Sequence, residues 1–188
     1  MPKKVFIFID GGNFYFKLKE LMSNTKERHS LLGFNFRKFS DWLVGDNDLV
    51  ESRYYIGKLS RKRGDLKSEL MYANQQKLIG KLQQQNIIIN FGQIIKHPDG
   101  SRHEKGVDVL LAVEMIRYAR QNKYDICYLL SSDTDLVPAV EEVKAIGKEV
   151  CYIGIAKGQS FGLTVVANDV RLIRPEEIEC FFDEAKII

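Results

Sequence analysis

Four aspartates stand beside or within apolar runs, where a protein core rarely keeps a charged side chain. Asp10 directly follows one such run, Asp108 lies inside a second, and Asp133 and Asp135 follow a third. An ionised carboxylate is costly to bury unless it is paired or coordinates a metal. Mg²⁺ and Mn²⁺ prefer oxygen ligands of this kind, and both ions act on phosphates. The pattern therefore predicts a divalent-metal site.

The first of these segments reads Asp-Gly-Gly-Asn at positions 10–13. The two glycines allow a tight turn and a close backbone approach, which directs Asp10 out of the end of the preceding strand. Asn13 could hydrogen-bond Asp10 or a bound water. The alternative is that Asp10 or Asn13 only caps the following helix.

The second segment, Lys-Gly-Val-Asp at 105–108, opens an apolar helix. Asp108 is in line with an apolar stripe of that helix, so we expect its carboxylate to face the protein instead of water. The alternative is a first-turn aspartate that complements the helix dipole. Lys105 could contact a phosphate or neutralise the acidic cluster, or it could be an ordinary solvated lysine.

The third segment, Ser-Ser-Asp-Thr-Asp at 131–135, is the strongest of the three. Two aspartates two residues apart cannot both cap one helix, and a proline at 138 places the start of a helix directly after them. They therefore occupy a corner between a strand and a helix. Hydroxyl groups around them can bind water or phosphate oxygens, and these belong to Ser131, Ser132 and Thr134.

A basic stretch after the second predicted strand could follow a nucleic-acid backbone, and two tyrosines before it could stack a base. The residues are Tyr54, Tyr55, Lys58, Arg61, Lys62, Arg63 and Lys67. The alternative is ordinary solvated surface. A second, weaker basic candidate lies before Asp108 and consists of Lys96, His97, Arg102 and His103.

Composition narrows the functional classes. With 188 residues, of which 45% are hydrophobic, we expect one domain spanning 1–188, its last strand and helix at 170–188 being the least defined part. A net charge of +3 excludes a histone-like polycation. Three scattered cysteines and three unpaired histidines argue for reduced thiols and against a zinc hydrolase. No apolar run reaches the roughly 20 residues of a membrane span, and the amino terminus leaves no room for a signal peptide, so we expect a cytoplasmic protein.

Short β-rich runs alternate with helical patterns along the chain. We expect strands at 4–9, 50–56, 87–89, 93–96, 126–130, 149–155 and 171–173, and helices at 13–22, 36–44, about 65–85, 105–120, 136–146, 161–167 and 176–182. Strands separated by helices predict a three-layer αβα sandwich with a mainly parallel central sheet and a Rossmann-like topology. Ligands of such sheets bind at the carboxyl ends of the strands, where the strand order reverses.

Taken together, the three segments resemble the NYN domain, in particular its LabA-like branch, within the PIN-like nuclease superfamily. The resemblance covers about residues 4–174 and rests on Asp-Gly-Gly-Asn, Lys-Gly-Val-Asp and Ser-Ser-Asp-Thr-Asp-Leu-Val-Pro in this order. It implies the same αβα sandwich. The positions that match the acidic catalytic and metal-binding residues of the family are Asp10, Asp108, Asp133 and Asp135, and the matching polar positions are Asn13, Ser132 and Thr134.

The resemblance implies metal-dependent hydrolysis of phosphodiester bonds, with one or two Mg²⁺ or Mn²⁺ ions activating a water. The expected partner is nucleic acid, with RNA favoured over DNA, and the expected activity is that of an endoribonuclease on single-stranded RNA. A haloacid-dehalogenase-like phosphatase fits the Asp-x-Asp pattern at Asp133 formally, but too little chain follows it. The serious alternative is a non-catalytic RNA-binding or protein-interaction module with the same fold.

Overall fold

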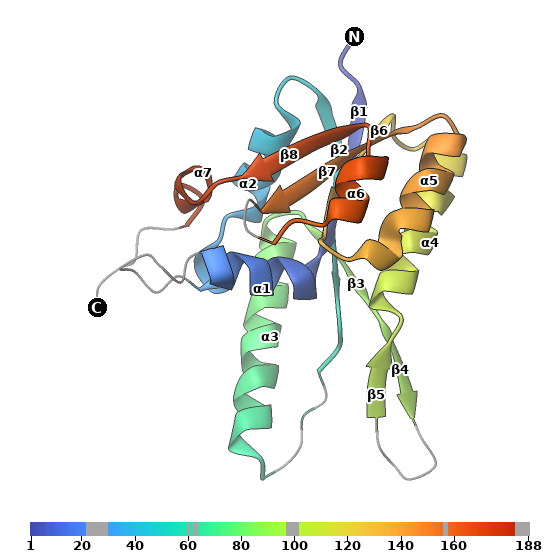
Figure 1. The fold of residues 1–188 in the computed structure, drawn as a ribbon. Coiled ribbons are helices and arrows are strands. Elements are labelled where there is room, and N and C mark those ends of the chain that lie inside the picture. Colours follow the sequence, from blue (N-terminus) through green and yellow to red (C-terminus); the bar gives the residue numbers. More distant parts are fainter. Residues whose placement is uncertain (22–29, 60, 62–63, 97–101, 156–157, 183–188) are drawn as a thin grey trace.

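The computed structural model describes residues 1–21, 30–59, 61, 64–96, 102–155 and 158–182, and for 93–96 and 102–105 it describes the backbone alone. Figure 1 shows a twisted sheet between two layers of helices. Within the described residues this sheet has six strands, all parallel, in the order β3-β2-β1-β6-β7-β8. The predicted three-layer αβα sandwich is therefore confirmed.

The strand order reverses beside β1. The strands are β1 (Lys4–Asp10), β2 (Asp48–Ile56), β3 (Ile88–Phe91), β6 (Ile126–Leu130), β7 (Glu149–Ile155) and β8 (Asp169–Ile173). From β1 the chain proceeds to β2 and β3 on one side, and later to β6, β7 and β8 on the other. Register pairs Asp10 with Tyr55 of β2 and Ile9 with Leu130 of β6. The carboxyl ends of β1 and β6 thus meet at the switch point, where a ligand site is expected.

Helices cover both faces of the sheet, which explains why β1 is apolar at every position between its ends. One buried cluster joins Val5, Ile7 and Ile9 to the helices α1, α2, α3 and α7. The other cluster joins Phe6 and Phe8 to α4, α5 and α6. The bounds are α1 Gly11–Leu21, α2 Phe36–Val44, α3 Leu66–Gln84, α4 Val107–Arg120, α5 Val137–Ala145, α6 Phe161–Val166 and α7 Pro175–Glu179, with short 3₁₀ turns η2 (Leu31–Gly33) and η3 (Thr134–Leu136).

Two elements extend beyond the carboxyl edge of the sheet. The first turns of α3 project away from it, and so does a ribbon formed by β4 (Gln93–Lys96) and the antiparallel β5 (Arg102–Lys105) (Figure 1). The prediction of a strand at 93–96 is confirmed, but this strand pairs with β5 and not with the central sheet. The turn predicted at 97–100 lies outside the described residues.

The helix predicted to begin at 105 begins two residues later. Lys105 is the last residue of β5, and α4 starts at Val107. Gly106 between them has a φ of 83°, a left-handed conformation that glycine adopts without a steric penalty. This glycine separates strand from helix, a boundary that the apolar periodicity alone did not reveal. No helix in the described part of the chain has the length and apolar character to cross a membrane.

Candidate metal centre

Asp10 ends β1 as a buried carboxylate with two hydrogen bonds. Its Oδ1 accepts from the backbone N–H of Asn13 at 3.0 Å, and its Oδ2 accepts from the hydroxyl of Ser131 at 2.9 Å. The first bond is a helix cap, as the alternative interpretation of this segment expected. The second bond joins the end of β1 to the end of β6, so the carboxylate also has a role that capping does not explain.

Gly11 is required by the close approach of β2. A Cβ atom at this position would lie 2.7 Å from the carbonyl oxygen of Tyr55 and 2.6 Å from Cζ of Tyr54, far inside van der Waals contact. The Tyr54 hydroxyl also donates to the Gly11 carbonyl at 3.2 Å. The glycine after Asp10 therefore lets α1 begin directly against β2, and this geometry holds Asp10 at the edge of the sheet.

Asn13 connects the same two strands from the helix side. Its side-chain Oδ1 accepts from the backbone N–H of Ser132 at 3.0 Å. Ser131 and Asn13 thus tie the turn after β6 to the turn after β1 by two separate hydrogen bonds. The relative position of Asp10 and Asp133 is fixed by these ties.

The turn after β6 contains two aspartates, of which Asp133 caps a helix and Asp135 does not. The Asp133 carboxylate accepts from the backbone N–H of Asp135 at 2.9 Å and so caps η3. The backbone N–H of Asp133 donates to the Ser131 hydroxyl at 3.1 Å. Asp133 is half-buried and Asp135 is exposed. As the sequence predicted, the cap accounts for one of the two aspartates only.

Asp108 differs from its prediction in exposure. It was expected to face the protein along an apolar stripe, and the stripe residues Leu111, Met115 and Ala119 are indeed buried. Asp108 itself is exposed, because it lies in the first turn of α4, beyond the edge of the sheet that these residues cover. Asp108 is nevertheless close enough to the other aspartates for their charges, after partial burial, to raise the pKa of its carboxyl group.

Burial and neighbouring carboxylates raise the pKa of two of the four aspartates, Asp108 and Asp10. Partial burial, followed by the negative charges of Asp10, Asp133 and Asp135, raises the pKa of Asp108. Burial also raises the pKa of Asp10, opposed by its hydrogen bonds from Asn13 and Ser131 and reinforced by the charge of Asp133. Like charges raise a carboxyl pKa in this way only at short range. The structure therefore brings the four sequence-predicted aspartates to one edge of the sheet.

These carboxylates fit a hydrated divalent cation better than a closed metal cage. Among the described residues, no group of three or more His, Cys, Asp or Glu side chains lies close enough together to enclose one ion. Mg²⁺ usually keeps several waters and uses one or two carboxylates together with substrate phosphates. A cation would also offset both causes of the raised pKa of Asp108, its partial burial and the repulsion by the other aspartates.

The small polar residues predicted around the aspartates differ in their position. Ser131 is buried, and its hydroxyl donates to Asp10 and accepts from the backbone N–H of Asp133. Ser132 is half-buried, and Thr134 is exposed beside Asp135. Lys105 belongs to β5, and its side chain lies outside the described part of the structure. Phosphate contacts by Ser132, Thr134 and Lys105 remain predictions.

The prediction that Tyr54 and Tyr55 stack a base is wrong. Both side chains are fully buried. The Tyr54 hydroxyl bonds to Gly11, and the Tyr55 hydroxyl donates to Glu114 on α4 at 2.7 Å. Both faces of β2 are covered at this point, one by α1 and α2 and the other by α4, so neither ring can reach a ligand in solution.

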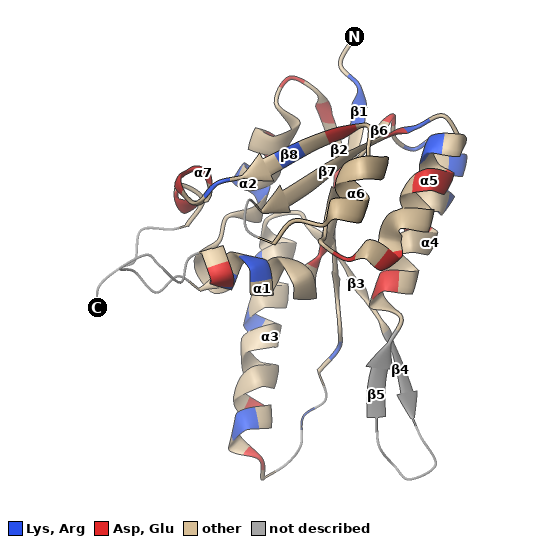
Figure 2. Ribbon diagram, in the orientation of Figure 1, with Lys and Arg blue, Asp and Glu red and all other residues tan. Residues whose placement is uncertain are grey.

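Part of the predicted basic stretch is exposed at the carboxyl edge. Figure 2 shows basic positions along the connection between β2 and α3 and at the start of α3. Lys58, Arg61 and Lys67 are exposed, and Arg61 lies 3.4 Å from Glu69 in a surface ion pair. Lys62 and Arg63 lie outside the described residues. So do His97 and the side chains of Lys96, Arg102 and His103.

Sequence reasoning overlooked Lys17. A small recess at the carboxyl edge is lined by Asn13, Lys17, Ser131 and Ser132 together with apolar side chains. Lys17 is one helical turn after Asn13 and therefore shares its face of α1. Its Nζ lies 3.6 Å from Glu20. The spacing of four from Asn13 was the signal that would have identified this cation beside the acidic site.

Comparisons with known proteins bear on the family and the fold. The family model described as the NYN domain matches residues 4–173. The fold is similar to the crystal structure of a protein of unknown function from Vibrio parahaemolyticus, with a TM-score of 0.66 and 21% identity over 92% of this chain and 93% of that chain. No curated protein matches the sequence.

Proposed function

The chain belongs to the NYN domain family, within the PIN-like nuclease superfamily, and we propose that it is a metal-dependent nuclease that hydrolyses phosphodiester bonds. The observation that carries this proposal is the meeting of the four aspartates at the carboxyl edge, where Ser131 joins Asp10 to the corner of Asp133, and where partial burial, followed by the other three carboxylates, raises the pKa of Asp108. Such a cluster is costly without a cation, and its position at the strand-order switch is the usual ligand site of this fold.

In this proposal one or two hydrated Mg²⁺ or Mn²⁺ ions would bind at the edge formed by Asp10, Asp108, Asp133 and Asp135, with one or two carboxylates on each ion and water in the other coordination positions. The bound metal supplies an activated water and stabilises the leaving oxygen of an in-line displacement. Ser131 and Asn13 orient the carboxylate of Asp10 through the hydrogen bonds between the ends of β1 and β6. No side-chain nucleophile is required.

The remaining polar groups would bind the substrate. Three residues that neighbour the aspartates in the sequence would contact the phosphate at the reacting centre, namely Ser132, Thr134 and Lys105. Lys58, Arg61 and Lys67, with Lys62 and Arg63 between them, would follow the backbone further along, since exposed lysines and arginines make contacts of this type. We propose single-stranded RNA as the substrate and the LabA-like branch as the subfamily, both as the resemblance to this family implies.

The activity is tested with the purified chain and end-labelled oligonucleotides. Single-stranded RNA, single-stranded DNA and duplex RNA are each incubated with Mg²⁺, Mn²⁺ or EDTA. We expect cleavage of single-stranded RNA in the presence of metal only, and cleavage of a circular RNA because an endonuclease needs no free end. Products that form equally in EDTA would contradict metal-dependent hydrolysis.

The second candidate is a non-catalytic nucleic-acid-binding module. It is favoured by one observation, the absence of an enclosing group of three metal-binding side chains among the described residues. Calorimetric titration with Mn²⁺ separates the two functions. Binding that is lost in Asp10→Asn supports the nuclease, and no heat of binding in the parent protein supports the module.

A further inference from the structure

Large aromatic rings remain exposed near the acidic cluster. Phe161 on α6 is 81% exposed, and Phe16 and Tyr15 on α1 are 68% and 43% exposed. Aromatic rings contribute much of the binding energy at interfaces, and exposed apolar surface often marks a binding site. Exposed rings close to a candidate functional site therefore call for an explanation. The position of each ring relative to the aspartates indicates what covers it.

Phe161 is held next to the corner that carries Asp133 and Asp135. Ser160 caps α6 by accepting from the N–H of Leu163, and its own N–H donates to the Tyr152 hydroxyl at 2.9 Å. A Cβ on Gly162 would lie 3.4 Å from Cγ2 of Thr134, so the start of α6 packs directly on η3. Phe161 precedes this contact by one residue, and its ring stands in solvent beside the acidic corner.

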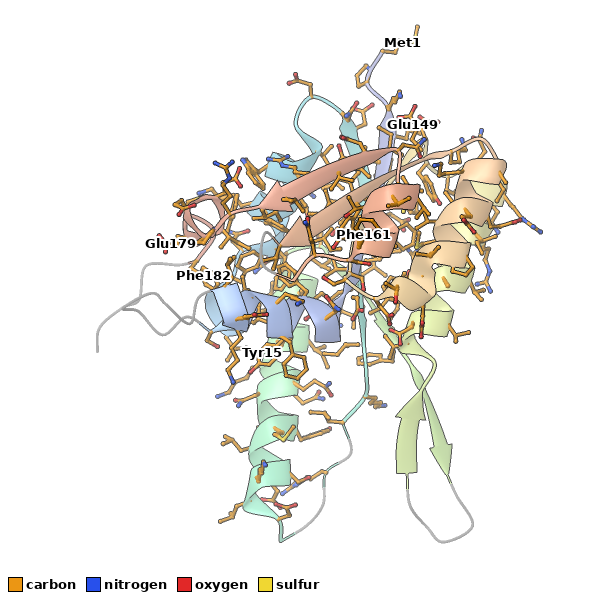
Figure 3. The ribbon with its side chains drawn as sticks, in the orientation of Figure 1. Met1, Tyr15, Glu149, Phe161, Glu179 and Phe182 are labelled. Atoms are coloured by element: carbon orange, nitrogen blue, oxygen red, sulfur yellow. The ribbon has the colours of Figure 1, made fainter. Side chains whose placement is uncertain are left out.

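Tyr15 and Phe16 are exposed on α1. They lie in the second turn of α1, the helix that starts directly after Asp10. Phe16 is three residues after Asn13 and therefore lies on its side of the helix. The two rings contact each other edge-on, with centroids 5.4 Å apart and an interplanar angle of 70°. Figure 3 shows Tyr15 on the lower side of α1 and Phe161 at the lower end of α6.

The two sets of rings belong to opposite layers of the sandwich. Helix α1 packs in the cluster that includes Ile7 and Ile9, whereas α6 packs in the cluster that includes Phe6 and Phe8. The carboxyl edge of the sheet, with its four aspartates, runs between these layers. A linear ligand that crosses the aspartates from one layer to the other would meet Phe161 on one side and the Tyr15–Phe16 pair on the other.

We propose that these rings are base-stacking platforms, with Phe161 binding an unpaired base on one side of the reacting phosphate and the Tyr15–Phe16 pair binding one on the other side. The inference rests on the proposed nuclease function and adds the side chains that would hold the unstacked bases of its single-stranded substrate. Every base presents an aromatic face, so this contact holds the strand without reading its sequence. Lys17 follows Phe16 in the sequence and lines the recess beside Ser132. Its positive charge would bind the phosphate backbone of the nucleic acid.

Base-stacking platforms disfavour the binding of duplexes. Bases in a duplex are already stacked on their neighbours and cannot accept a protein ring without being unstacked. A site that depends on Phe161 and Phe16 therefore favours single strands over duplexes of the same sequence. This preference follows from the rings and requires no contact to a particular base.

The test measures binding separately from cleavage. Affinities of a fluorescent single-stranded RNA are determined in EDTA for the parent, Phe161→Ala and Phe16→Ala, and again with an RNA that has abasic sites at its central positions. Stacking on one ring is worth roughly a 5-fold or larger change in affinity. We expect each variant to bind the ordinary RNA more weakly by about this factor and to equal the parent with the abasic RNA. Phe161→Trp should retain binding.

Val165→Ala is the matched control, because Val165 is 65% exposed one turn further along α6. It should leave the affinity unchanged. Thermal melting of each variant checks that the fold is intact, as expected for exposed side chains. The inference is overturned if Phe161→Ala and Phe16→Ala bind like the parent, if their affinity for abasic RNA falls by the same factor, or if they change the oligomeric state instead of the affinity.

Cleavage assays run in parallel separate this inference from the proposed function. A parent protein that cleaves RNA, with ring variants of unchanged affinity, refutes the platforms and leaves the nuclease intact. A parent that never cleaves, with ring variants that lose stacking-dependent affinity, refutes the nuclease and supports the platforms as part of a binding module.

Discussion

Arg53 of β2 and Glu114 of α4 form an ion pair inside the protein, with 3.1 Å between Nη1 and Oε2. Both residues are buried. The same Oε2 accepts from the Tyr55 hydroxyl at 2.7 Å, and the Arg53 guanidinium lies 4.3 Å from the ring centre of Tyr118. This group fastens α4 to the sheet, and α4 carries Asp108. The position of one site aspartate thus depends on a polar contact well inside the fold.

Glu114→Ala should be strongly destabilising. The substitution leaves the buried Tyr55 hydroxyl without this acceptor, whereas Arg53 keeps its ion pair with Glu51 at 2.7 Å. A buried polar group left without a partner costs about 1–3 kcal/mol. Urea unfolding measures the effect. The control is Glu142→Ala, which removes an exposed ion pair with 2.7 Å between Glu142 Oε1 and Arg120 Nη2. This substitution should lower the free energy of unfolding by at most about 1 kcal/mol. Equal losses of stability in both variants would contradict a supporting role for the buried pair.

Asp10→Asn and Asp133→Asn should each abolish metal-dependent cleavage of single-stranded RNA, while the melting temperature without metal rises or stays unchanged. Removing one charge relieves the repulsion among the four carboxylates. Asp46→Asn serves as the control, since Asp46 is exposed just before β2, at the amino edge of the sheet. If the Asp10 and Asp133 variants cleave as fast as the parent, the aspartate cluster is not the catalyst.

The stability of the metal-free protein should depend on pH through Asp10. Burial raises the pKa of Asp10 above 3.8, so the folded state takes up its proton before the unfolded state does as the pH falls. Ionised Asp10 therefore lowers stability at neutral pH, and the melting-temperature advantage of Asp10→Asn should shrink as the pH approaches about 4. Thermal melts in EDTA across this range provide the measurement.

Asp125 offers a control of opposite sign. The backbone N–H of Lys4, which donates to its carboxylate at 2.9 Å, lowers the pKa of Asp125. Its ionised form stabilises the fold above pH 3.8, and this contribution is lost as the pH falls through the lowered pKa. Asp125→Asn should accordingly lower the melting temperature at neutral pH. Equal behaviour of the Asp10 and Asp125 variants would show that local electrostatics do not explain either effect.

Neutralising Lys58 and Lys67 with glutamine should weaken RNA binding and flatten its salt dependence. For a single strand, removing one lysine–phosphate interaction reduces the slope of log K against log salt by about 0.7. Lys123→Gln is the control, because Lys123 is exposed just before the amino end of β6, on the opposite edge from the aspartates. An unchanged slope in the double variant would identify this basic stretch as ordinary solvated surface.

Thiol titration should distinguish the three cysteines. Burial raises the pKa of Cys127, and burial together with Asp169 raises the pKa of Cys151 to about 12. Cys180 is exposed. Because the thiolate is the reactive form, an aromatic disulfide reagent should modify Cys180 quickly and the other two only after unfolding. Rapid reaction of Cys127 in the native protein would contradict its place in the core.

The fold and the aspartates could be predicted because both follow from apolar runs. A strand covered on two faces is apolar throughout, so the runs before Asp10 and Asp133 identified the strands, and the charged residue after each run identified the carboxyl edge. The exposure of Tyr54 and Tyr55 was predicted wrongly because a strand covered on two faces shows no alternation of polar and apolar residues. In a strand without alternation, nothing in the sequence tells a buried tyrosine from an exposed one, and their closeness to basic residues in sequence suggested an exposure that the two helix layers prevent.

Long-range pairing accounts for the other misses. The antiparallel partner of residues 93–96 and the role of Gly106 depend on a ribbon whose second strand is too short and polar to give a β pattern. Phe161 became a candidate only after α6 was seen to pack on η3, an arrangement of segments that no local sequence pattern encodes. The sequence predicted the chemistry of individual segments, whereas contacts between distant segments were found only in the folded structure.

The place of β1 between β2 and β6 has a consequence for the order of assembly. Its pairing with β2 can form once the first third of the chain has left the ribosome, but its pairing with β6 must wait for a segment more than one hundred residues downstream of its own start. Until then one edge of β1 is unpaired, and contacts of such long sequence separation form slowly. Asp10 meets Ser131 only at this late step. A prematurely terminated chain that lacks β6 therefore contains Asp10 without its Ser131 partner, and under the proposed nuclease function such a chain has no assembled centre with which to attack nucleic acid during synthesis.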